Sequence, residues 1–394
     1  MSDKRVLLLI LLFIILSGCS NYKQLNEVAI IVGMGVDYIP KKDVYEVTFQ
    51  AINPSANAMQ IGNSKATPVV SYKATGKTIS EAARNSSKQI SRQNIYSHVA
   101  LVVIGETLAA KESLNFVFDV FERDAKVRVN VPVLIARNAR VHEVMDILPS
   151  LDKVPMVSLI GRIKNTSKLL GEHGEVKIYQ IISALASKGR EPAVSGISVK
   201  GNKKIGTTNA NVERMENTFA VLNGVGIFKK GKLVGWLEGK KTKSIQIVNN
   251  TLKQTNLSIP CNKKKDNSVQ VKSAHSDVKV DMDHSQAIIH IRTHVNATLD
   301  EILCNKNIND YKVIKEFEHE AEQEFKKETY DGIVSAQMME SDVFGFGDIL
   351  HRTHPVKWKK QKQHWDQIFS KAKVYIDVDV NIEGTGMRVR PYPY

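Results

Sequence analysis

Cysteine is scarce in this chain of 394 residues, which contains only three: Cys19, Cys261 and Cys304. Three cysteines cannot form the dense disulfide framework with which small secreted domains compensate for a small core. The chain must therefore be stabilised mainly by buried apolar side chains, and its hydrophobic fraction of 42% is typical of a globular protein. At ~100–200 residues per domain, the length allows two or three domains.

Long hydrophobic runs are scarce as well. The longest run, Val6–Leu16, contains eleven apolar residues, whereas a helix that spans a bilayer needs ~20. No later segment of the sequence approaches that length. We therefore expect everything after Cys19 to lie outside the bilayer.

The short apolar run belongs to an N-terminus with the layout of a secretory signal peptide. Lys4 and Arg5 precede the run, and small residues that lead to Gly18 and Cys19 follow it. A cysteine directly after small residues resembles a bacterial lipobox, in which the chain is cut before the cysteine and the thiol is joined to a diacylglycerol. We therefore predict removal of residues 1–18 and lipidation of Cys19. The alternative is an ordinary secretory signal with an incidental cysteine.

A formal charge of +14 indicates anionic partners, either nucleic acid or an anionic membrane surface. The sequence has no helix-turn-helix, zinc-finger or aromatic–basic RNA signature, and an exported protein rarely meets nucleic acid. We expect a membrane surface and no nucleic acid. Basic residues near an anionic leaflet contribute roughly 1 kcal/mol each, so they would tune the orientation of a chain that lipid already anchors.

The two remaining cysteines, Cys261 and Cys304, lie in the exported part of the chain. An oxidising compartment permits a disulfide between them. Free cysteine is, however, among the most frequently buried residue types. We expect buried free thiols at both positions.

Apolar periodicity predicts an alternation of strands and helices in the first half of the chain. Such alternation favours an α/β domain with parallel strand pairing. Turn residues between the first two strands indicate a hairpin. The predicted strands cover residues 28–37, 44–52, 69–74, 99–104 and 128–136, and the predicted helices cover residues 78–93, 114–121, 141–148, 151–170 and 177–187.

The second half combines a hairpin, further strands and one long helix. The hairpin covers residues 219–236, and the long helix covers residues 309–339, with Gly332 as a candidate interruption. The other predicted strands cover residues 269–271, 278–280, 287–297 and 374–382. The fold class that follows is multi-domain α/β (α+β), with mixed β-sheets flanked by helices.

A polar stretch over residues 201–216 indicates a loop between domains. We predict an N-terminal α/β domain over residues 19–200, with room for a further split, and a C-terminal α/β domain over residues 217–394. The total is two to three domains.

Two patterns raise the question of enzyme chemistry. Ser150 and Lys153 match the S-x-x-K pattern of penicillin-binding enzymes, but no S-D-N or K-T-G partner follows in the appropriate order. We interpret the match as accidental and predict neither a catalytic residue nor a cofactor.

Among eleven histidines, two pairs have a spacing that suits a metal. His290 and His294 lie on one face of a predicted strand, and His351 and His354 lie near a helix end. A metal site needs a third ligand, which the spacing does not supply. We therefore predict a solvated strand face and a helix turn, and no metal.

Trp358 and Trp365 are seven residues apart and so share a helix face. Tryptophan pairs of this kind are more often part of a core than of a ligand stack. Because tryptophan is enriched at binding hot spots, the two residues are also our candidates for a partner interface.

Three blocks of sequence resemble the Ger(x)C family, the lipoprotein C subunits of spore nutrient-germinant receptors. The blocks are SGCSNYKQLNEVAIIVGMGVD, LNGVGIFKKGKLVGWL and SDVFGFGDILHRTHPVKWKKQKQHWDQIFSKAKVYIDVDVNI. The last is the most specific, because Gly-Phe-Gly, the Pro355–Trp358 step and Trp365-Asp366 occur in order. The opening departs slightly, since Ser20-Asn21-Tyr22 stands where family members commonly have a Trp-Asp-type pair.

The resemblance implies a non-enzymatic subunit anchored by Cys19 on the outer face of the spore inner membrane. It implies two partners, the polytopic A and B membrane subunits, and α/β domains, of which the family has three. It carries over no catalytic residue, and it does not say whether this subunit binds the nutrient itself. The alternatives from other classes are a substrate-binding lipoprotein of a transporter and a cell-wall enzyme.

Overall fold

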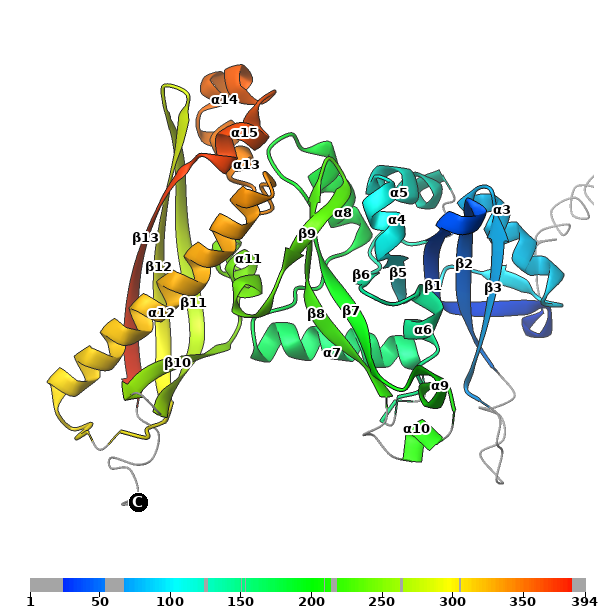
Figure 1. The fold of residues 1–394 in the computed structure, drawn as a ribbon, viewed down its shortest axis with the longest axis horizontal. Coiled ribbons are helices and arrows are strands. Elements are labelled where there is room, and N and C mark those ends of the chain that lie inside the picture. The colour runs from blue at the N-terminus through cyan, green and yellow to red at the C-terminus, as the bar shows by residue number, and fades with distance from the viewer. Residues whose placement is uncertain are drawn as a thin grey trace, which may run out of the picture.

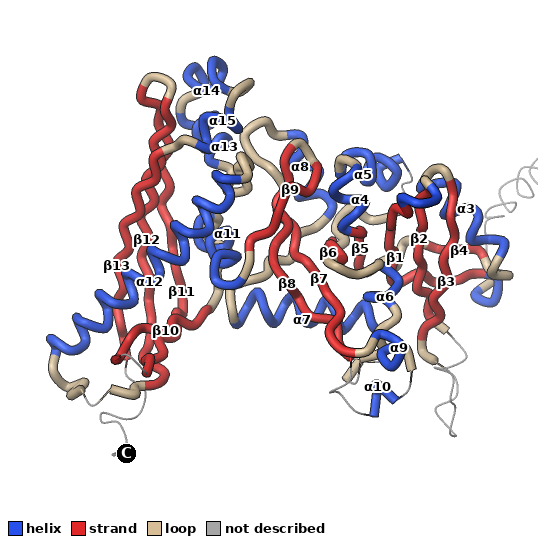
Figure 2. Tube along the Cα trace, viewed as in Figure 1, coloured by secondary structure: helices blue, strands red, loops and turns tan. Residues whose placement is uncertain are grey.

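The computed structural model describes residues 24–53, 67–123, 127–149, 151–152, 154–208, 210–213, 218–262, 265–304 and 306–384. The described chain is elongated, with a larger sheet toward one end and a smaller sheet at the other (Figure 1). Helices pack on both sheets (Figure 2). The predicted fold class, multi-domain α/β with mixed sheets flanked by helices, is confirmed.

The larger sheet has nine strands within the described residues, in the order β3-β2-β1-β5-β6-β7-β8-β9, with β4 paired to the start of β1. Pairing is parallel from β1 through β5 and β6 to β7 and antiparallel at both ends, so the predicted parallel pairing is confirmed. The bounds are β1 Val28–Ile39, β2 Val44–Ile52, β3 Val69–Gly76, β4 Gln93–Ile95, β5 Leu101–Gly105, β6 Val133–Ala136, β7 Ala193–Gly201, β8 Thr218–Lys229 and β9 Lys232–Leu237.

The centre of this sheet is buried on both faces because β5 is a continuous apolar run. Leu101 and Val103 belong to the core on one face, and Val102 and Ile104 belong to the core on the other. All four side chains are fully buried. A strand without alternation is what a two-sided parallel sheet requires.

Helices cover both faces of the larger sheet. One face packs against α3 Ile79–Asn85, α4 Glu106–Lys111, α5 Leu114–Arg123 and α8 Ile178–Ala186, and the other packs against α6 Val141–Met145 and α7 Pro155–Leu169. α7 crosses β7 and β8 at an angle in both views (Figures 1 and 2).

Several predicted elements of this part are shorter in the structure, among them the helix predicted over residues 78–93 and the strand predicted over residues 128–136. Thr78 caps α3, since its hydroxyl oxygen accepts a hydrogen bond from the Glu81 N–H at 3.0 Å. The helix ends at Asn85, however, and a 3-10 turn over Ser86–Lys88 follows. The strand predicted over residues 128–136 begins only at Val133.

The stretch over residues 201–216 contains two short helices, α9 Lys203–Gly206 and α10 Ala210–Glu213, instead of a plain loop. β7 ends at Gly201, the first residue of the stretch, and β8 begins at Thr218, just after it; these two strands pair antiparallel. The larger sheet therefore continues across the division predicted at residues 200 and 217. The predicted hairpin over residues 219–236 is confirmed as β8 and β9.

The smaller sheet has four strands within the described part of the chain, in the order β10-β11-β12-β13. Their bounds are β10 Thr255–Asn262, β11 Lys265–Asp283, β12 Gln286–Glu301 and β13 Lys373–Gly384. The long helix α12 Tyr311–Met338 crosses one face (Figure 1), and its side chains Phe317, Ala321 and Phe325 are buried in the core. The remaining helices are α11 Lys243–Val248, α13 Phe346–Thr353, α14 Pro355–Gln361 and α15 Trp365–Ser370. The two sheets differ in strand number and order, so the chain does not form two similar lobes.

Gly332 does not interrupt α12, which runs without a break from Tyr311 to Met338. A Cβ atom at this position would collide with Ser244 Oγ and would lie 2.7 Å from the carbonyl oxygen of Lys241. Glycine is required here because α11 and the turn before it approach the helix closely.

Cys304 is disulfide-bonded, so the expectation of a free thiol at this position is wrong. The expectation rested on burial, and burial fits a disulfide-bonded cysteine as well as a free one. Cys304 is buried, and its sulfur accepts a hydrogen bond from Asn267 Nδ2 at 3.2 Å. The side chain of Cys261 lies outside the described side chains.

Candidate functional site

Several predicted site residues fall outside the described part of the chain. Gly18 and Cys19, the predicted cleavage and lipidation positions, lie before its first residue. Ser150 and Lys153 of the S-x-x-K pattern also lie outside it. These predictions therefore remain predictions.

The histidine pairs take the positions that their spacing predicts. His290 and His294 lie on the exposed face of β12, where His290 stacks on Tyr375 with ring centroids 5.0 Å apart. His351 lies in α13, and His354 directly precedes α14. The two pairs lie on different elements and do not form one cluster.

Trp358 and Trp365 lie in the core of the C-terminal part, with only 4% and 2% of their surface exposed. Their rings meet edge to face, with centroids 5.5 Å apart and an interplanar angle of 71°. The core interpretation is therefore confirmed. The prediction that the two tryptophans share one helix face is wrong, because α14 ends at Gln361 and Trp365 begins the separate helix α15. The indole rings themselves offer little surface to a partner, and an interface role for them remains untested.

A buried carboxylate organises the sequence block that contains these tryptophans. Asp342 accepts hydrogen bonds from the backbone N–H groups of Gly345 (2.8 Å), Phe346 (3.2 Å) and Gly347 (2.8 Å). It also accepts one from the indole Nε1–H of Trp365 at 2.9 Å. Burial raises the pKa of Asp342 to about 6, although all four donors act in the opposite direction. Asp342 thus ties the Gly-Phe-Gly turn to α15.

The same turn forms the junction between the two parts of the chain. The backbone N–H of Glu191, just before β7, donates to the carbonyl oxygen of Asp342 at 2.9 Å. The backbone N–H of Asp348 donates back to the carbonyl oxygen of Gly189 at 3.2 Å. Paired main-chain bonds of this kind hold the loop before β7 and the Gly-Phe-Gly turn in one register.

Arg190 adds a side-chain link at this junction. Its Nη2 donates to Asn249 Oδ1, at the end of α11, at 2.6 Å and to the carbonyl oxygen of Phe344 at 3.3 Å. Gly345 has a φ of +78°, and a Cβ atom there would lie 2.9 Å from Arg190 Nε. Glycine therefore serves both the left-handed turn and the close approach of the guanidinium. The junction thus joins the loop before β7 to the Gly-Phe-Gly turn and to the end of α11.

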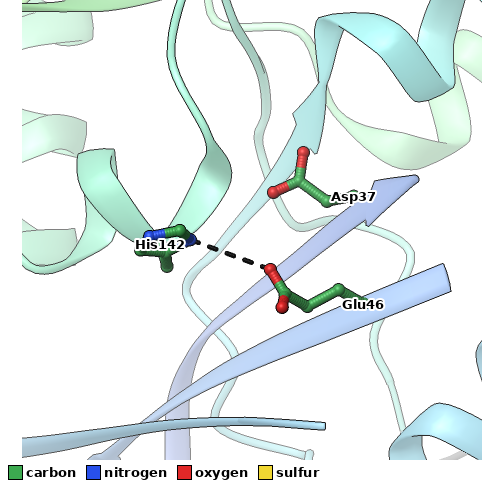
Figure 3. A group of neighbouring side chains, drawn as sticks. All are labelled: Asp37, Glu46 and His142. Carbon is green, nitrogen blue, oxygen red and sulfur yellow. Dashed lines mark ion pairs between the residues drawn. The ribbon is translucent and has the colours of Figure 1, made fainter. Parts of the chain in front are cut away.

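A second polar cluster lies between the larger sheet and α6, where the side chains of Asp37, Glu46 and His142 meet (Figure 3). Asp37 on β1 and Glu46 on β2 are direct cross-strand partners, and His142 comes from α6. Both carboxylates are buried, with 3% and 7% of their surface exposed. Like charges directly opposite one another on a sheet destabilise it, so this pair needs a compensating cation.

Arg140 supplies that cation. Its Nε lies 3.2 Å from Asp37 Oδ2, and its Nη2 lies 3.1 Å from Glu46 Oε1. Asp37 also accepts a hydrogen bond from the backbone N–H of Val141 at 2.9 Å, yet burial raises the pKa of Asp37. The pKa of Glu46 is held below its usual range, first by His142 and then by positive neighbours that include Arg140.

The donor set of Asp37, Glu46 and His142 would suit a metal by type, since their ligand atoms lie within 4.8 Å of one another. The guanidinium of Arg140, however, already bridges the two carboxylates. The arrangement therefore fits an ion-pair network that fastens α6 to the sheet better than it fits a metal site.

Sequence reasoning did not single out Asp342 or Arg140. For Asp342 a local signal existed, because an aspartate before a glycine-rich turn commonly accepts hydrogen bonds from the backbone that follows. Arg140 meets its partners across 103 and 94 residues, and no local pattern predicts such contacts.

Two family models match this chain. The spore germination protein N-terminal domain matches residues 21–199, and the spore germination B3/GerAC-like C-terminal domain matches residues 223–386. The matches meet at the stretch that contains α9 and α10. This chain belongs to the GerAC-like family of spore germination proteins. The resemblance drawn from the three sequence blocks is confirmed.

Relatives within the GerAC-like family align over nearly their whole length. Spore germination protein KC of Bacillus subtilis (strain 168) is 28% identical over 98% of this chain and 96% of its own. Spore germination protein B3 of the same organism is 24% identical, over 94% of this chain and 95% of that protein. Spore germination protein GerQC of Bacillus cereus is 20% identical, over 98% of this chain and 99% of that protein. These names refer to germination and state no reaction.

The GerAC-like fold is also seen in an experimental structure. The crystal structure of the GerBC protein aligns with a TM-score of 0.57 at 18% identity, over 92% of this chain and all of that one. At this identity the match supports the fold alone. Among the described residues, no helix has the length and apolar character needed to cross a membrane.

Proposed function

We propose that this chain is the lipid-anchored C subunit of a spore nutrient-germinant receptor. The observation that carries the proposal is that a signal peptide with a lipobox directly precedes two germination domains. The two germination domains together begin at residue 21 and end at residue 386, and the residues before them read as a signal peptide that ends at a lipobox cysteine, Cys19.

The proposed subunit lies on the outer face of the spore inner membrane and acts through contacts with the polytopic A and B membrane subunits. It is non-enzymatic. A lipid anchor confines a folded body to two dimensions and so raises its effective concentration near membrane partners. The hydrogen-bonded junction around Asp342 and Arg190 supports this role, because a body of fixed shape can transmit a contact made at one end to the other.

The anchor is tested by Cys19→Ala in sporulating cells, with Ser20→Ala in the same tether as the matched control. Lipidation needs the thiol of Cys19, so we expect Cys19→Ala to move the protein from the membrane fraction to the soluble fraction and to impair nutrient germination. Ser20→Ala should leave both unchanged. Membranes are washed at high salt first, because salt screens binding that depends on surface charge alone.

The proposal of a lipid anchor is contradicted if Cys19→Ala stays in the salt-washed membrane fraction to the same extent as the unchanged protein.

A further inference from the structure

The outer face of the smaller sheet carries a row of side chains that three strands bring together. His275 on β11 is the direct cross-strand partner of His294 on β12, and His294 is the direct partner of Asp379 on β13. All three are exposed and lie on the face opposite α12. Side chains on directly paired residues have Cβ atoms ~4.5–5.5 Å apart, which places the two imidazoles within reach of one ion.

We propose that this face binds a divalent transition-metal ion, with zinc as the preferred ion, through His275, His294 and Asp277. Imidazole nitrogens and a carboxylate oxygen are the donors of three-ligand zinc sites, and a water fills the fourth position. The proposal goes beyond the receptor function and does not depend on the lipid anchor.

One distance between two of the proposed ligands already suits a zinc ion, and His294 joins them by turning its ring. His275 Nε2 and Asp277 Oδ1 are 3.8 Å apart, and two ligand atoms on one tetrahedral zinc are about 3.4 Å apart. His294 Nδ1 lies 3.3 Å from Asp379 Oδ2. A carboxylate on one ring nitrogen orients a histidine so that its other nitrogen faces a metal. Asp379 is thus the positioning residue for His294.

The three ligand side chains are free to turn toward one ion. His275, Asp277 and His294 have side-chain exposures of 69%, 65% and 55%, so no packing fixes their rotamers. Arg292 lies on the same face, where it pairs in register with Asp277 and with Asp377. When Asp277 binds the ion, Asp377 is the register partner left to offset this positive charge, which would otherwise repel a cation.

The test is calorimetric titration of zinc into the mature chain, without a histidine tag and with Cys19→Ser so that no N-terminal thiol competes. We expect one zinc per chain at neutral pH and loss of binding at mildly acidic pH, where protonated imidazoles do not bind metal. His275→Ala and His294→Ala should each weaken binding at least tenfold, and Asp379→Asn should weaken it by about 10–100-fold.

His290→Ala is the matched control, because His290 lies on the same strand and the same exposed face, four residues from His294. It should keep the affinity of the unchanged chain. The proposal is overturned if the chain binds no zinc, if the His275→Ala/His294→Ala double variant binds as tightly as the unchanged chain, or if His290→Ala loses binding equally. Circular dichroism shows that each variant is folded, as expected for exposed positions.

Discussion

Single buried side chains in this protein have proton affinities set by burial. Asp342 has its pKa raised to about 6, and His173 has its pKa lowered to about 4. In both cases burial favours the neutral form. Asp342 is surrounded by four hydrogen-bond donors, whereas the Nδ1 atom of His173 is buried without a hydrogen-bond partner. His173 is therefore the cleaner reporter of burial.

His173 should make the protein less stable in mild acid. Between pH 4 and 6.5 the unfolded chain binds a proton at this residue and the folded chain does not, so the free energy of unfolding falls as pH falls through this window. A shift of this size is worth on the order of 3 kcal/mol. His173→Gln should remove this part of the pH dependence in urea unfolding.

The control for this measurement is His98→Gln, since His98 is exposed and should leave the pH dependence unchanged. If the free energy of unfolding of His173→Gln changes with pH between 4 and 6.5 as steeply as that of the unchanged protein, burial of this ring does not destabilise the protein in acid.

At the scale of elements, the Gly-Phe-Gly turn and α15 depend on one carboxylate. Asp342→Asn keeps one of the two acceptor oxygens and replaces the other by an NH₂ group. Because each oxygen accepts two of the four hydrogen bonds, two bonds are lost. Hydrogen bonds to charged groups are worth about 1.5–3 kcal/mol each, so we expect a loss of about 3 kcal/mol or more. Trp365→Phe removes one of the four bonds and keeps an aromatic ring, so its loss should be smaller. Urea unfolding midpoints measure both.

The order of these two losses matters as much as their size. If Asp342→Asn unfolds at the same urea concentration as the unchanged protein, or if Trp365→Phe is the more damaging change, Asp342 does not organise the junction.

At the scale of the whole molecule, local patterns predicted most elements and few of the contacts between them. The two hairpins, the long helix α12 and the parallel centre of the larger sheet follow from apolar spacing and turn residues. The continuation of this sheet across residues 201–216 was not predictable. A polar stretch indicates an exposed connection, but it does not show whether the strands before and after it belong to the same sheet. The junction likewise depends on contacts over distances such as the 154 residues between Arg190 and Phe344.

The candidate site was predictable to a lesser extent. Sequence blocks led to the right family, and the two tryptophans were correctly interpreted as core. The row formed by His275, His294 and Asp379 depends on strand register, and register is fixed only when the sheet assembles.

The central claim is that this chain works as a receptor subunit beside the A and B membrane proteins. The most direct test is affinity isolation of the tagged chain from spore inner membranes dissolved in mild detergent, followed by mass spectrometry. We expect the A and B subunits to be recovered together with the chain. Recovery of the chain in good yield without either subunit would contradict it.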